Sequence, residues 1–204
     1  MARGFKHKGR LYVARLDETE RGVVAGLMDQ TRDLLAPPER ESTGDPFEDL
    51  VAGLGVSLAA EDQTPQTPDQ VEHRDPALER LLPTAHRGDD QIAAEFRRLT
   101  EHDLRDRKAT NLATAVAALR RATGERLELT RAEAEAMVIA LTDTRLLLGE
   151  RLGLRTDEDA THLDERLAGL DDDDPTIYAV SFYDFLTWLQ ESLTNALTGR
   201  GVFG

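Results

Sequence analysis

The chain has 204 residues, of which 40% are hydrophobic, and its 25 basic and 39 acidic residues give a formal net charge of −14. This acidity argues against broad, sequence-independent binding of nucleic acids, because the affinity of such binding comes from neutralised phosphates. The chain contains no cysteine, which excludes disulfides, thiolate zinc sites and thiol-based sensing of oxidants.

The length suits a single domain that covers residues 1–204. Residues 1–16 lack the apolar stretch of a secretion signal, and no apolar run approaches the ~18 residues of a membrane span. We therefore expect a cytoplasmic protein that makes no contact with a membrane.

Residues 5–16 predict a small β-hairpin, because two short runs of alternating residues flank Gly9. Residues 1–16 also hold five cations and no acid. No neighbouring carboxylate cancels the field of this basic arm, so it is the best candidate for a weak contact with DNA. The candidate DNA-contact residues are Arg3, Lys6, Lys8 and Arg10.

The first helix is predicted to follow the hairpin directly. Asp17 and Glu20 have the spacing of a capping box, and Pro37 and Pro38 end the helical pattern. Residues 55–74 have little apolar surface to pack and predict a mobile linker. A further short helix is expected at Asp75, where an N-cap residue precedes proline.

Residues 89–198 predict the main helical core. The pattern over 89–122 places Phe96 and Val116 on nearly opposite faces, which fits either one helix that buries two faces or a helix that breaks near Thr110. We favour the continuous helix because no Gly or Pro interrupts it. Residues 126–129 predict a short strand that joins the hairpin as a third strand.

Two more helices complete the pattern. Thr130 and Glu133 form a capping box before a helix over 131–152, and a last helix runs from Tyr178 to about Leu197. The acidic stretch between them, up to Pro175, is expected to be loop. The predicted fold class is therefore mainly α, a helical bundle with a small N-terminal β-hairpin.

Arg145 is the most unusual charged residue in the predicted core. It shares a helix face with Leu141 and Leu148, where a guanidinium needs an acceptor. We predict a buried ion pair with an acid of a neighbouring helix, Glu95 or Glu101. A role in fixing the fold is favoured over a role in catalysis.

Two aromatic residues of the last helix are candidates for an interface. Trp188 and Tyr183 project to either side of the apolar stripe that Tyr178 and Phe185 belong to, and that stripe is typical of core. Aromatic residues in such places often anchor protein interfaces, while the alternative is a wide buried face.

The chain has no recognisable reaction centre. It contains no phosphate-binding loop and no nucleophile elbow, and its five histidines are scattered. We therefore predict no catalytic residue, no metal ligand and no cofactor, and the protein is not expected to be an enzyme.

Four stretches in this order and spacing carry a family resemblance: 81–86 (LLPTAH), 95–101 (EFRRLTE), 143–153 (DTRLLLGERLG) and 183–191 (YDFLTWLQE). With them, most of the chain resembles the actinobacterial family of AosR-type oxidative-stress transcriptional regulators, formerly a domain-of-unknown-function family, whose members are typically encoded beside the proteolysis adaptor ClpS. The resemblance implies no catalytic residues. The chain differs from the family in one respect. The disulfide-based sensing associated with that label needs cysteines, and this chain has none.

The resemblance implies a regulator of transcription, and the acidity favours a protein partner, a sigma factor or an RNA polymerase subunit, over DNA alone. The alternative is an adaptor or accessory protein for Clp-type proteolysis, which the neighbourhood of ClpS suggests. A homodimer is compatible with the sequence.

Overall fold

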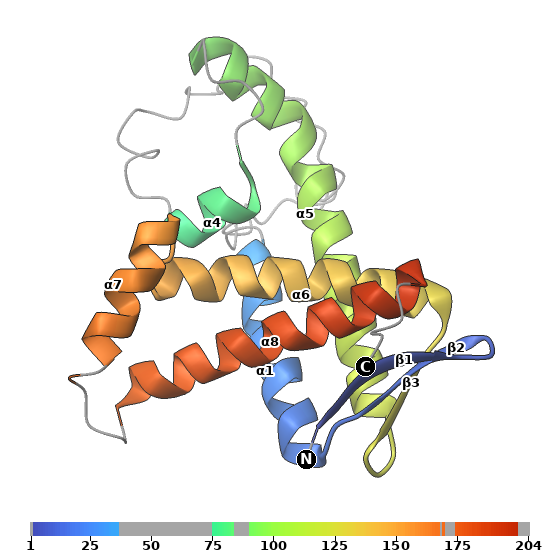
Figure 1. The fold of residues 1–204 in the computed structure, drawn as a ribbon. Helices are drawn as coiled ribbons and strands as arrows, with labels where there is room; N and C mark the ends of the chain where they lie inside the picture. The colour runs from blue at the N-terminus through green and yellow to red at the C-terminus, as the bar shows by residue number, and fades with distance from the viewer. Residues whose placement is uncertain (1, 37–74, 84–89, 168, 170–173, 200–204) are drawn as a thin grey trace, which may run out of the picture.

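The computed structural model describes residues 2–36, 75–83, 90–167, 169 and 174–199, and for 90–99, 157, 164 and 166 it describes the backbone alone. The fold is mainly helical with one small antiparallel sheet, as predicted (Figure 1). The predicted mobile linker, 55–74, lies outside the described residues.

The sheet has three strands in the order β1-β2-β3. Strands β1 (Arg3–Lys8) and β2 (Leu11–Arg15) form the predicted hairpin, and β3 (Arg126–Leu129) pairs with β2 as the predicted third strand. Gly9 in the tight turn has a φ of +66°, a left-handed conformation that glycine adopts at little cost. Local turn chemistry and alternation therefore identified all three strands.

Capping residues lie at the helix starts that were predicted from the sequence. Helix α1 (Glu18–Leu35) begins at Asp17 with a complete capping box, and α6 (Arg131–Arg151) begins in the same way at Thr130. The short helix α4 (Pro76–Leu81) starts at Asp75, whose carboxylate accepts the Ala77 N–H at 2.9 Å. In each case a side-chain oxygen satisfies a backbone donor that the helix itself leaves unpaired.

Helix α5 (Asp90–Arg121) is continuous over 32 residues, which confirms the choice of one helix. Its first part extends away from the other helices, whereas its second part packs against α1 and α6 (Figure 1). Leu112, Val116 and Leu119 of this second part are buried. The apolar stripe changes side along the sequence because the second part of α5 packs against α1 and α6, whereas the first part does not.

The acidic stretch expected to be loop is partly helical. Helix α7 (Asp157–Leu167) begins after Thr156, whose backbone N–H donates to the Asp159 carboxylate at 2.7 Å. The Asp159 N–H donates in turn to the Thr156 hydroxyl at 3.3 Å, and Leu163 is buried. A capping pair and one apolar anchor outweigh the charge of this segment, and the loop prediction was wrong here.

Helix α8 (Pro175–Thr198) lies antiparallel to α6 and also packs against β1 (Figure 1). The buried apolar residues form one cluster to which α1, α4, α5, α6, α8 and the inner face of the sheet all contribute. The core thus extends beyond the predicted range of 89–198. The sheet lies at one end of α6 and α7 at the other (Figure 1).

Candidate functional site

The four cations proposed to contact DNA lie together on the sheet. Arg3, Lys6 and Lys8 belong to the edge strand β1, Arg10 lies in the turn that follows, and all four side chains are exposed. They are therefore carried by a paired strand and its turn, and a strand holds its side chains in fixed directions.

Strand register adds two arginines, Arg15 and Arg126, to the four candidate residues. Arg3 is paired with Arg15 of β2, and Arg15 is paired with Arg126 of β3, so three arginines form one row across the sheet. Lys6 pairs with Val13 and Val13 with Glu128, so these residues share that face. The alternation of residues in β2 and β3 was the available signal that Arg15 and Arg126 point away from the core. Which residues are paired across the strands depends on the strand register.

The opposite face of the sheet is apolar and buried. Tyr12 pairs with Leu129 and Ala14 with Leu127, and all four residues are part of the core. Because successive side chains of a strand point to opposite faces, burial of this set directs the arginines outward. The core therefore holds the charged face in place.

Arg145 does not form the predicted ion pair with Glu101. Its guanidinium donates to the Gln190 side-chain oxygen at 2.8 Å and to the Tyr183 hydroxyl at 3.3 Å, and it lies 5.1 Å from the centre of the Tyr183 ring. Glu101 instead binds Arg105, four residues along its own helix, at 2.7 Å. The side chain of Glu95 lies outside the described residues.

The reason is the rotational position of Arg145 on α6. Helix α5 packs on the side of α6 that carries Asp143, where Lys108 forms an ion pair with the Asp143 carboxylate. Two residues further along an α-helix is a turn of about 200°, so Arg145 faces α8 and not α5. A buried ion pair between α5 and α6 does exist, but its members are Lys108 and Asp143.

Asp143 is the most buried charged group among the described residues, with 1% of its surface exposed. Burial raises the pKa of its carboxyl above the ordinary value, although Lys108 acts in the opposite direction. One carboxylate oxygen, Oδ2, is buried and has no hydrogen-bond partner. The pair thus carries a desolvation cost that offsets part of the attraction between its two charges.

We predict that Arg145→Leu lowers the free energy of unfolding by only about 1 kcal/mol, because its partners are neutral and no charge is left unpaired in the core. Gln190 keeps its hydrogen bond to the Thr142 hydroxyl at 2.8 Å. Urea denaturation of both proteins measures the difference. A loss of about 3 kcal/mol or more would indicate an acidic partner after all.

The two predicted interface aromatics have different surroundings. Trp188 is 39% exposed, and its ring lies 5.7 Å from that of Phe185. Tyr183 is half-buried and binds Arg145 within the chain. Tyr178, which the stripe placed in the core, is 54% exposed. Helix α8 thus exposes Tyr178, which the predicted core would have covered, as well as Trp188.

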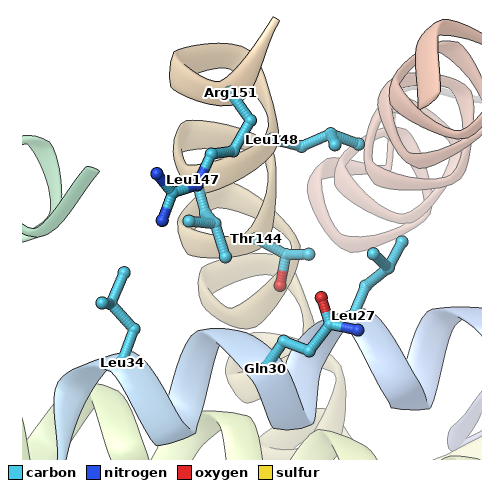
Figure 2. Close-up of a pocket in the computed structure, with 7 residues that line it drawn as sticks. All are labelled: Leu27, Gln30, Leu34, Thr144, Leu147, Leu148 and Arg151. Carbon is cyan, nitrogen blue, oxygen red and sulfur yellow. The ribbon is translucent and has the colours of Figure 1, made fainter. Parts of the chain in front are cut away.

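One pocket of about 330 Å³ lies between α1 and α6 (Figure 2). Figure 2 shows side chains from both helices around it: Leu27, Gln30, Leu34, Thr144, Leu147, Leu148 and Arg151. Arg151 is held by the Asp75 carboxylate, and the Thr144 hydroxyl donates to the Ala140 carbonyl at 2.8 Å. The lining thus provides apolar surface and no pair of a nucleophile and a base.

A family model matches residues 2–197, which is nearly the whole chain. The chain belongs to the DUF2017 family. This family is described as a domain of unknown function. No curated protein and no solved structure matches the chain.

Within the described part of this DUF2017 chain, no group of three or more His, Asp or Glu side chains is placed to hold a metal ion. Among the helices in those same residues, none is both long and apolar enough to cross a membrane. Two surfaces in the described residues are candidate binding sites: the outer face of the sheet, and the aromatic side of α8, which we define by Trp188 and Phe185.

Proposed function

We propose that the protein is a non-enzymatic regulator of transcription that acts by binding another protein, a sigma factor or an RNA polymerase subunit. The observation that carries the proposal is the exposed aromatic surface of α8, where Trp188 is 39% exposed beside Phe185. Tryptophan is enriched among the residues that dominate binding energy at protein interfaces. The contact between the two rings limits their freedom before binding, which lowers the entropy cost of association.

The net charge of −14 supports a protein as the main partner, because a strongly acidic chain is repelled by nucleic acids over most of its surface. The transcriptional role comes from the resemblance to AosR-type regulators in the four motifs, one of which, 183–191, contains Trp188. Without cysteine, the signal for such a regulator is independent of its own thiols.

The proposal is tested with purified partners immobilised separately: core RNA polymerase, individual sigma factors, ClpS and the Clp ATPase. We expect binding to a sigma factor or polymerase, and we expect Trp188→Ser to weaken it at least tenfold, since hot-spot residues contribute about 2 kcal/mol or more. Ile139→Ser is the matched control, because Ile139 is 42% exposed on α6. Binding to Clp components alone would favour the adaptor role, and an equal effect of both variants would remove Trp188 from the interface.

A further inference from the structure

The outer face of the sheet gathers exposed cations in the described part of this acidic chain. We define the basic face by five exposed residues: Arg3, Lys6, Lys8, Arg15 and Arg126. Its one acid from the three strands is Glu128, which binds Arg126. Arg10 extends the same charge into the turn of the hairpin.

The arrangement of these charges does not stabilise the fold by itself. Arg3, Arg15 and Arg126 are direct neighbours across the strands, and like charges in such positions destabilise a sheet. Arg3, Lys6, Lys8 and Arg15 make no ion pair with any described residue. Their side chains are exposed, so packing does not require them either. A bound polyanion would relieve the repulsion.

The dimensions of the face match a stretch of DNA backbone. From Arg3 to Lys8 a strand extends about 17 Å, and three strands are about 10 Å wide. One strand of duplex DNA carries a phosphate for about every 3.4 Å of helix axis. The basic face is therefore about as long as five phosphates of one DNA strand, with Arg3, Lys6 and Lys8 along that length and the row of Arg3, Arg15 and Arg126 across it. We propose that this face binds the phosphate backbone of duplex DNA without reading its sequence.

The acidity of the rest of the chain is compatible with this contact. The acidic helix α7 lies beyond the far end of α6 from the sheet (Figure 1). Helix α6 has 21 residues, so the two regions are separated by about 30 Å, more than three Debye lengths at physiological salt. The acids of α7 are therefore screened from the bound phosphates.

DNA binding by this face would add to the proposed regulation of transcription, and the expectation that the DNA is a promoter rests on that proposed function. The basic face and the aromatic side of α8 adjoin at β1: Arg3 belongs to the basic face, and a Cβ on the next residue, Gly4, would lie 3.3 Å from the Trp188 ring. A regulator that holds a protein partner through α8 would thus add a weak, non-specific contact to nearby DNA.

The test measures fluorescence anisotropy of a labelled mixed-sequence duplex with the full chain alone, so its result does not depend on any protein partner. With five cations offset by one carboxylate, we expect affinity to fall about 100-fold for a fourfold rise in salt. The variant Arg3→Gln/Arg15→Gln/Arg126→Gln should bind at least tenfold more weakly and reduce the log–log salt slope by about 2.7.

The matched control is Arg107→Gln/Arg131→Gln/Arg155→Gln, which removes three exposed arginines elsewhere and gives the same net charge. We expect it to keep the wild-type salt slope. Arg15→Gln alone, with a slope reduced by about 0.9, is a second measure if the triple variant unfolds.

Three results would overturn the inference. They are an equal loss in both triple variants, tighter binding of poly-glutamate than of the duplex, and self-association at low salt through the basic face. The second result would identify an acidic protein partner, and the third a second copy of the chain. Failure of the sigma-factor or polymerase binding described above would leave the duplex measurement unchanged, so the two proposals fail separately.

Discussion

Replacing Lys108 with Met should lower the free energy of unfolding by about 3 kcal/mol, near the lower end for a broken buried ion pair. Asp143 has no other charged partner among the described residues, and its carboxylate is almost fully buried. Lys108 itself is partly exposed, with 17% of its side chain accessible, which keeps the loss at the lower end. Urea denaturation measures it, and Arg107→Met, the exposed neighbour, should cost little.

The loss in Lys108→Met should depend on pH in a defined direction. The pKa of Asp143 is already raised by burial, and removing Lys108 removes both effects that lower it. A raised folded-state pKa gives a contribution to stability that is complete below the unfolded-state pKa and is lost as pH rises through the folded-state pKa. The variant should therefore be closest to the wild type in mild acid and furthest from it above neutral pH.

A double variant makes this explanation testable. Lys108→Met/Asp143→Leu removes the orphaned charge as well as its partner, so it should be more stable than Lys108→Met alone. Two results would contradict it: a free energy of unfolding lost by the double variant that equals the sum of the losses of the single variants, or a loss in Lys108→Met that does not change with pH. Either result would show that the unpaired Asp143 carboxylate does not cause the loss of stability.

Gly4→Ala should lower the free energy of unfolding by about 2 kcal/mol, because α8 passes too close for a side chain. A Cβ on Gly4 would lie 2.7 Å from the Ser192 Cβ and 3.3 Å from the Trp188 ring. The Phe5 N–H donates to the Ser192 hydroxyl at 3.0 Å, so a shift of α8 would also weaken this bond. Thermal unfolding followed by circular dichroism measures the effect.

The same substitution at Gly22 should have the opposite sign. Gly22 lies exposed in α1 with open space around it, and alanine in a helix is favoured over glycine by about 1 kcal/mol. In a Ser192→Gly background, Gly4→Ala should cost much less than in the wild type, since the clashing atoms are gone. An unchanged cost in that background would show that α8 does not press on β1 at this point.

Most of the elements were predictable because their signals are local. The Asp17 and Thr130 capping boxes, the turn at Gly9 and the proline at position 76 each act within four residues of the position that they determine. The loop predicted around α7 was wrong because the acidic composition concealed a capping pair at Thr156 and Asp159.

The candidate site was only half predictable. The cations of residues 1–16 were visible as a cluster, but Arg126 joins them from more than a hundred residues away through strand register. Arg145 was correctly singled out as an unusual charge, and its partners were not, because they depend on which helix packs against each side of α6.

The sequence by itself determined where helices and strands begin, where the chain turns, and that thiol chemistry is absent, because these properties depend on composition or on neighbours within a few residues. Only the tertiary structure decided that three arginines share a row, that Lys108 and not Arg145 forms the buried pair, and that Trp188 stays exposed. Each of these depends on the angle and register at which distant segments pack, and one step of register or two residues of helix reverses the face that a side chain occupies.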